Sequence, residues 1–152
     1  MKRFSMLMLV FAIVFISGSF AQAEDHAYVG AAKCKMCHKV QYASWAESSH
    51  AKALDHAKAA TDKTYGDDCL QCHATNSKAE LPGVQCEACH GAGADYKKMS
   101  IMKDHEKAIA NGLIDVTQAT CDACHTGEDH AAKKVLADEK DNNAAIHEHK
   151  KK

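Results

Sequence analysis

The sequence predicts a mostly α-helical chain with long loops, wrapped around a core that its own side chains do not supply. Three observations lead to this fold class. Proline occurs once in 152 residues, and no stretch alternates apolar and polar residues as a strand does. All four phenylalanines fall within residues 1–20, so one tryptophan and four tyrosines are the aromatic residues of the remainder. All eight cysteines form pairs at one spacing, and a histidine follows each pair.

The first 23 residues have the features of an export signal. Two basic residues at positions 2 and 3 precede an apolar run, and the segment ends in the cleavage pattern A-x-A. The apolar run is short for a helix that crosses a bilayer. The sequence therefore predicts a signal peptide over 1–23 and one domain over 24–152, with no integral membrane segment after cleavage. The expected location is the periplasm, with the cell surface as an alternative.

The charge balance of the chain is ordinary. Lysine and arginine number 19 against 20 aspartates and glutamates, which gives a formal net charge of −1. No basic stripe is interleaved with aromatic residues, so a nucleic-acid partner is excluded.

The first predicted helix covers residues 39–60, and polar loops follow it at 61–68 and 74–83. Its apolar positions are Val40, Tyr42, Trp45 and Leu54. A second helix is expected over 95–111, with Gly112 as its C-cap. The tail 131–152 is helix-prone and is interrupted at 141–143.

The cysteine pairs are four copies of the pattern Cys-x-x-Cys-His. They are CKMCH at 34–38 (motif 1), CLQCH at 69–73 (motif 2), CEACH at 86–90 (motif 3) and CDACH at 121–125 (motif 4). Disulfides and four-cysteine zinc sites both occur with this spacing. Neither of them needs a histidine after every pair, whereas a c-type haem does.

Covalent haem explains the pattern fully. Two thiols bond to the two vinyl groups of the porphyrin, and the adjacent imidazole binds the iron as proximal ligand. The sequence therefore predicts four haems c, which also supply the missing core. The residues expected to hold them are Cys34, Cys37, His38, Cys69, Cys72, His73, Cys86, Cys89, His90, Cys121, Cys124 and His125. Motifs 2 and 3 are separated only by residues 74–85, so their haems are expected to be neighbours.

The other histidines are candidates for the second axial position of each iron. They are His26, His50, His56, His105, His130, His147 and His149. His50 follows His38 by 12 residues, about 18 Å along a helix, so it would serve a different haem. His147 and His149 differ by about 200° around a helix, so at most one of them faces a given iron, and His147 is preferred.

His105 lies within the helix expected after motif 3 and completes the predicted set of distal iron ligands with His50 and His147. Met99 and Met102 of the same helix are assigned to packing.

Four stretches carry a resemblance to a known family. They are YVGAAKCKMCH at 28–38, SWAESSHAKAL at 44–54, GVQCEACHGAG at 83–93 and IHEHKKK at 146–152. The chain resembles the cytochrome c-554 family of tetrahaem c-type cytochromes. The resemblance implies helices around stacked haem pairs and electron transfer in the periplasm.

The resemblance also implies how the distal histidines are distributed. It places His50 on the haem of motif 4, His105 on that of motif 1 and His147 on that of motif 3. The haem of motif 2 would be five-coordinate. The alternatives for its sixth position are no ligand, His26, His56 or His130.

The leading hypothesis is an electron carrier, not an enzyme, whose partners are redox proteins such as a quinol dehydrogenase or other cytochromes. One alternative is the reduction of nitric oxide, hydroxylamine or nitrite at a five-coordinate haem of motif 2. Another is a subunit of a cytochrome filament in which a histidine of one copy binds a haem of the next.

Overall fold

The computed structural model describes residues 26–128 and 130–148, where the chain consists of short helices and loops. No strand forms in these ranges, and isolated bridges from Ala74 to Pro82 and Gly83 are the only pairing of that kind within them. The predicted mostly helical fold class is confirmed. The predicted signal peptide lies outside the described residues.

The helices are short. They are α1 (Ala31–Cys34), α2 (Lys39–Glu47), α3 (Ala53–Ala59), the 3-10 helix η1 (Asp67–Cys69), α4 (Leu70–His73), the 3-10 helix η2 (Thr75–Ser77), α5 (Cys86–His90), α6 (Met99–Met102), α7 (His105–Ala110), α8 (Gln118–Asp122) and α9 (Leu136–Glu139). None of these described helices has the length and apolar character needed to cross a membrane.

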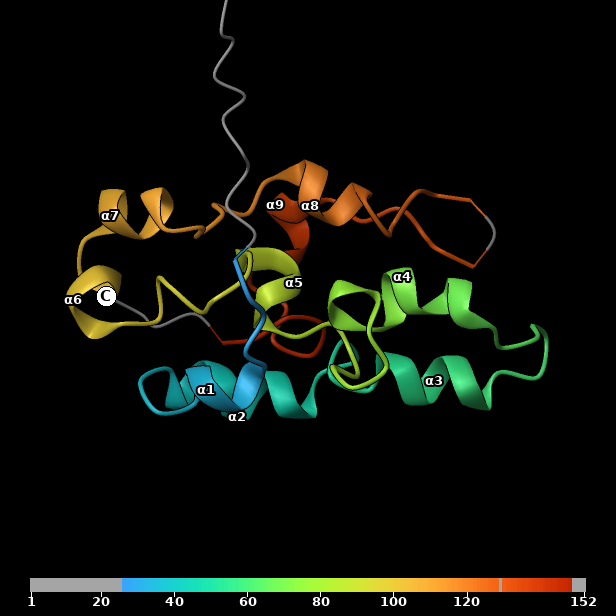
Figure 1. The fold of residues 1–152 in the computed structure, drawn as a ribbon. Helices are drawn as coiled ribbons and strands as arrows, with labels where there is room; N and C mark the ends of the chain where they lie inside the picture. The colour runs from blue at the N-terminus through green and yellow to red at the C-terminus, as the bar shows by residue number, and fades with distance from the viewer. Residues whose placement is uncertain (1–25, 129, 149–152) are drawn as a thin grey trace, which may run out of the picture.

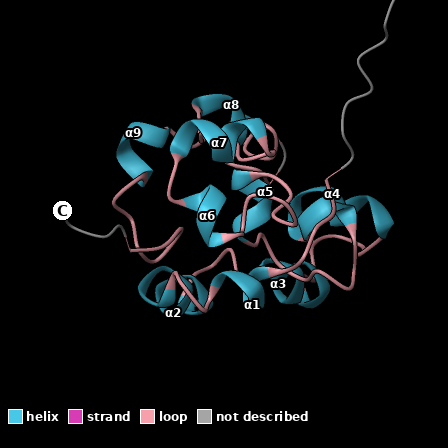
Figure 2. Cartoon of the chain, turned by 60° about the vertical axis from the view of Figure 1, so that its left-hand side comes forward, coloured by secondary structure: helices cyan, strands magenta, loops and turns pink. Residues whose placement is uncertain are grey.

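The helices lie on two sides of α5. Helices α1, α2 and α3 run along one side, and α7, α8 and α9 lie on the opposite side, as Figure 1 and the turned view in Figure 2 both show. Residues 86–90, which form α5, therefore lie between these two groups of helices.

The helix expected over 39–60 is two helices, α2 and α3, joined by a turn. Ser48 is buried and its backbone is extended, with ψ at 163°, which ends α2. The turn carries His50, whose carbonyl accepts a hydrogen bond of 2.9 Å from the backbone N–H of Val84. The break follows from this tertiary contact, which local helix propensity does not reveal.

The helix expected over 95–111 is also divided, into α6 and α7. Asp104 adopts an extended backbone between them, and its carboxylate accepts a hydrogen bond of 3.2 Å from the backbone N–H of Lys107. This contact is an N-cap, which starts a new helix. In the described part of the tail, helix forms only at α9.

Few apolar side chains are buried, and most of them are small. They are Ala31, Ala53, Leu54, Ala74, Ala92, Tyr96 and Ala108. A domain normally buries many leucines, isoleucines, valines and phenylalanines. This composition agrees with the expectation that the core comes from outside the chain.

Candidate haem-binding site

Each cysteine motif lies on a helical turn. Motif 3 is α5 itself, and motif 2 spans the end of η1 and α4. In motifs 1 and 4 the turn is closed by the N–H of the histidine, which donates to the carbonyl of the first cysteine at 2.9 and 2.8 Å. Residues three or four apart share one face of a helix, so both thiols and the imidazole reach the same side.

The donor set favours haem over zinc. All eight cysteines lie in the described ranges, and none of them is paired in a disulfide. A structural zinc site gathers four protein ligands. Among the described residues, no three or more His, Cys, Asp or Glu side chains converge to hold a metal ion. A porphyrin brings its own equatorial nitrogens, so the chain needs to provide only thiols for attachment and axial ligands.

Three motif histidines each face a histidine from elsewhere in the chain. His125 of motif 4 faces His50, with ring centroids 6.1 Å apart. His90 of motif 3 faces His147 at 6.4 Å. His73 of motif 2 faces His130 at 5.9 Å.

The spacing of these pairs matches two imidazoles on opposite sides of one metal ion. An imidazole nitrogen binds such an ion at about 2 Å and lies about 1 Å from its ring centroid, so two coaxial ligands have centroids about 6 Å apart. Aromatic pairs in general cover a wide range of spacings. Here every pair joins one motif histidine to one other histidine, and the three centroid distances differ by at most half an ångström.

Backbone carbonyls set the tautomer of several of these rings. The Nδ1–H of His73 donates to the carbonyl of Ala53 at 2.8 Å, and that of His125 to the carbonyl of Ala132 at 3.0 Å. His147 uses Nδ1 in the same way toward the carbonyl of Glu148 at 3.1 Å. Because Nδ1 carries the proton, Nε2 keeps its lone pair, as a metal ligand must.

Burial disfavours the protonated form of two of the rings. It lowers the pKa of His50, and the nearby His125 lowers this pKa further. Burial likewise lowers the pKa of His90, with His147 as the second cause, while a backbone hydrogen bond at Ile114 acts in the opposite direction. Neutral imidazole is the form that binds metal.

Cysteine side chains of different motifs lie near one another. Cys34 of motif 1 and Cys86 of motif 3 influence each other, so that the pKa of Cys34 is raised and that of Cys86 is lowered. The pKa of Cys124 of motif 4 is raised, first by burial and then by its neighbour Cys72 of motif 2. These neighbours therefore pair motif 1 with motif 3 and motif 2 with motif 4.

The link between these two pairs runs through motifs 3 and 4. The pKa of Cys89 is raised by burial and by the nearby Cys121. The spatial order of the motifs is thus 1, 3, 4, 2. Adjacency of the haems of motifs 2 and 3, expected from their short separation in sequence, stays a prediction.

Glu87, inside motif 3, was not singled out by the sequence as a site residue. It is 1 % exposed, and its carboxylate accepts hydrogen bonds from the backbone N–H groups of Val29, Gly30 and Gly93 at 2.7 to 3.1 Å. The side chain therefore holds the segment before motif 1 against the loop after motif 3. The feature of the sequence that could have indicated this role is an acidic residue between the two cysteines of motif 3.

Among the described residues, the ring of His105 does not face another histidine ring. Its Nε2 lies 3.2 Å from a carboxylate oxygen of Asp115, and its side chain is 63 % exposed. His56 is exposed on α3. His149 lies outside the described residues, whereas His147 is held nearby by a 2.9 Å bond from the N–H of Glu148 to Ser44 Oγ.

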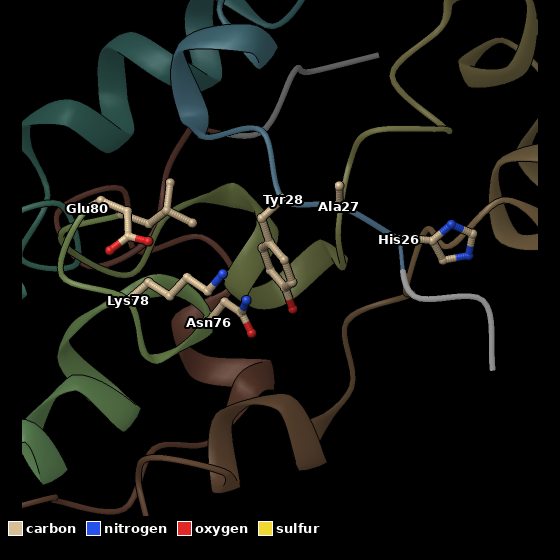
Figure 3. Close-up of a pocket in the computed structure, with 7 residues that line it drawn as sticks. His26, Ala27, Tyr28, Asn76, Lys78 and Glu80 are labelled. Atoms are coloured by element: carbon tan, nitrogen blue, oxygen red, sulfur yellow. The ribbon is translucent and has the colours of Figure 1, made fainter. Parts of the chain in front are cut away.

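His26 lies apart from the ring pairs. Its Nδ1 is 2.9 Å from a carboxylate oxygen of Asp95. It lines a pocket of about 380 Å³ with Tyr28, Asn76, Lys78 and Glu80 (Figure 3). None of the paired histidines lines this pocket.

A small helical scaffold with four Cys-x-x-Cys-His turns and facing imidazoles defines the class of multihaem c-type cytochromes. The comparisons with known proteins agree. The family model described as "Cytochrome c554 and c-prime" matches residues 33–91. Cytochrome c-554 of Nitrosomonas europaea is 32 % identical over 126 aligned residues, which cover 66 % of this chain and 52 % of the relative. This chain thus spans about half the length of that relative.

A solved structure gives the same result for the fold. The reduced state of cytochrome c554 from Nitrosomonas europaea superimposes with a TM-score of 0.62 at 26 % identity, covering 82 % of this chain and 86 % of that one. The chain is thus similar in sequence and fold to the cytochrome c554 family, and its eight cysteines provide four haem c sites.

Proposed function

We propose that this chain is an exported electron carrier that moves electrons between redox proteins of a respiratory chain. The observation that carries this proposal is the proximity of the four motifs, because cysteines of motifs 1 and 3, 3 and 4, and 4 and 2 lie near enough to influence one another electrostatically. Covalently attached haems undergo one-electron redox chemistry at potentials set by their ligands and burial. Attachment points that lie this close together favour transfer within the molecule.

The proposed attachment residues are the cysteines and histidines of motifs 1 to 4. The ring pairs support His50 as the distal ligand at motif 4 and His147 as the distal ligand at motif 3. The assignment of His105 as the distal ligand at motif 1 rests on the family resemblance. The expected signal peptide supports a periplasmic location, and the partners are expected to be a quinol dehydrogenase or other cytochromes.

The test uses the mature holoprotein with four haems per chain, verified by haem assay. Dithionite reduces it, and excess oxidised soluble cytochrome c is then added in a rapid-mixing experiment. We expect reoxidation of all four haems, with an equal number of electrons appearing on cytochrome c. Haems that stay reduced in the presence of this acceptor, together with rapid consumption of nitrite or hydroxylamine, would contradict the proposal.

The assignment of His105 has its own test. The resemblance predicts that His105→Ala leaves one more iron without a sixth ligand, so one more haem gives a high-spin signal in the EPR spectrum. Asp115→Asn is the matched control, since it weakens the observed hydrogen bond and leaves the imidazole in place. An unchanged spectrum for His105→Ala would remove His105 from the ligand set.

The filament hypothesis stays a prediction. Gel filtration over a wide range of protein concentration tests it, and a species that remains monomeric throughout would exclude it.

A further inference from the structure

We infer that His130 is the distal iron ligand at motif 2, so that the haem held by Cys69, Cys72 and His73 is six-coordinate. This inference rests on the proposed attachment of a haem to motif 2. It differs from the five-coordinate haem that the family resemblance implies at this position.

The ring geometry is the first argument. The centroids of His73 and His130 are 5.9 Å apart and their planes differ by 22°. This separation is close to the spacing of about 6 Å expected for two imidazoles on opposite sides of one metal ion. The distance falls within half an ångström of those of the His50–His125 and His90–His147 pairs.

The state of the proximal ring is the second argument. The Nδ1–H of His73 donates to the carbonyl of Ala53 at 2.8 Å. This bond anchors the imidazole to the start of α3 and leaves Nε2 as the lone-pair nitrogen.

Hydrogen bonds within the loop that carries His130 hold it in place. Gly127, at a φ of +86°, donates its N–H to the carbonyl of Ala131 at 2.8 Å, and the N–H of Ala131 donates to the carbonyl of Glu128 at 3.0 Å. A positive φ of this size is accessible chiefly to glycine. These bonds form a tight turn around His130.

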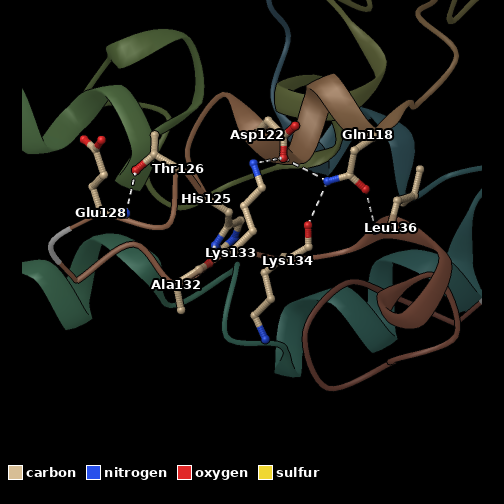
Figure 4. A network of polar contacts seen from close by, with 9 residues as sticks. All are labelled: Gln118, Asp122, His125, Thr126, Glu128, Ala132, Lys133, Lys134 and Leu136. Carbon is tan, nitrogen blue, oxygen red and sulfur yellow. Dashed lines mark hydrogen bonds and ion pairs between the residues drawn. The ribbon is translucent and has the colours of Figure 1, made fainter.

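Side chains hold both ends of this loop, as Figure 4 shows. At its start, His125 Nδ1 donates to the carbonyl of Ala132 at 3.0 Å. Further along, Lys133 forms a 2.8 Å ion pair with Asp122, and Gln118 donates to the carbonyl of Lys134 at 2.8 Å.

The loop is tied to motif 2 as well as to motif 4. The Sγ of Cys124 lies 3.9 Å from the carbonyl oxygen of Gln71, inside motif 2. The motif that begins the loop is therefore fixed next to the haem that His130 would bind.

A six-coordinate iron at motif 2 has a functional consequence. Small molecules such as nitric oxide bind an iron that has an open axial position, and a bound imidazole occupies it. The inference therefore assigns the motif 2 haem to electron transfer and removes it as a site for small-molecule reduction.

The test compares His130→Ala with wild type, both as mature holoproteins with four haems per chain. We expect the variant to gain one high-spin ferric haem in its EPR spectrum and to bind one more carbon monoxide per reduced chain. Added imidazole should restore the low-spin spectrum. His56→Ala is the matched control, since His56 is an exposed histidine without a place in the ring pairs, and it should change neither quantity.

Equal high-spin content and equal carbon monoxide stoichiometry in His130→Ala and wild type would overturn the inference. Where the alanine variant matures with fewer than four haems, His130→Gln keeps a polar side chain of similar size and is read in the same way. Electron transfer to cytochrome c by the wild-type holoprotein is measured separately. Failure of the proposed carrier function is thus distinguishable from failure of this ligand assignment.

Discussion

At the scale of single residues, Glu87 shows how a charged side chain can organise the backbone around a cofactor site. Its carboxylate is buried and accepts bonds from the N–H groups of Val29, Gly30 and Gly93. Buried N–H groups must find acceptors, and an ionised carboxylate offers the strongest kind of hydrogen bond to them.

Replacing Glu87 with glutamine should therefore be costly. An amide has one acceptor oxygen, and its NH₂ group would face backbone N–H donors. We expect Glu87→Gln to lower the free energy of unfolding of the holoprotein by about 1.5–3 kcal/mol, the range for hydrogen bonds to charged groups. Guanidinium unfolding, followed by the haem absorbance, measures this change.

Glu80→Gln serves as the control, because Glu80 is exposed. Equal unfolding midpoints for the two variants would mean that the buried carboxylate contributes nothing specific.

At the scale of elements, two turns fix the position of His50. Gly83 adopts a φ of +78°, and a Cβ built on it would lie 2.5 Å from the carbonyl oxygen of Ala51 and 2.9 Å from that of His50. The next N–H, from Val84, donates to the same His50 carbonyl. The segment before motif 3 therefore positions a histidine that faces motif 4.

Gly83→Ala should disturb both turns, since backbone oxygens cannot move aside as a flexible side chain can. We expect a loss of stability of more than about 1 kcal/mol, because the native φ is unfavourable for alanine. A partial high-spin EPR signal should accompany it, because His50 is displaced.

Gly66→Ala is the comparison for this prediction, since Gly66 has an extended backbone and its nearest neighbour is the end of the Asp68 side chain. A low-spin spectrum in Gly83→Ala, with stability equal to that of Gly66→Ala, would refute the prediction.

The sequence predicted the helical class but not the lengths of the helices. Periodicity suggested one helix over 39–60, yet the chain turns at Ser48 and restarts at Ala53. The turn depends on the bond between Val84 and His50, two residues far apart in sequence. The local sequence pattern does not reveal a contact between distant residues. The cysteine motifs are local, so they can be recognised directly from the sequence.

The same distinction applies to the histidines. Spacing alone predicts that His50 serves a haem other than that of motif 1, but it left His26, His56 and His130 as alternatives for motif 2, with His26 preferred among them. Among the described residues, the ring of His130 faces that of His73, and the rings of His26 and His56 form no such pair.

At the scale of the whole molecule, the small buried side chains make the fold dependent on its cofactor. Chain entropy opposes folding by a large amount, and a core composed mainly of alanines offsets little of it. We expect the chain without haem, produced with all eight cysteines replaced by serine, to lack a unique fold.

The measurement is a ¹H–¹⁵N NMR spectrum of this variant. Collapsed, poorly dispersed amide signals are expected for it, with dispersed signals for the holoprotein. A well-dispersed spectrum from the serine variant would show that the side chains suffice to fold the chain.

The order of the motifs in space, 1, 3, 4, 2, gives the molecule two distinct ends. Motif 1 has Met36 78 % exposed at one end, while motif 2 lies at the other, beyond the central α5. Under the proposed carrier function, a donor at one end and an acceptor at the other would not compete for one surface. Turnover in such a ternary complex needs no partner to leave before the next electron enters, so its rate should depend on each partner's concentration independently.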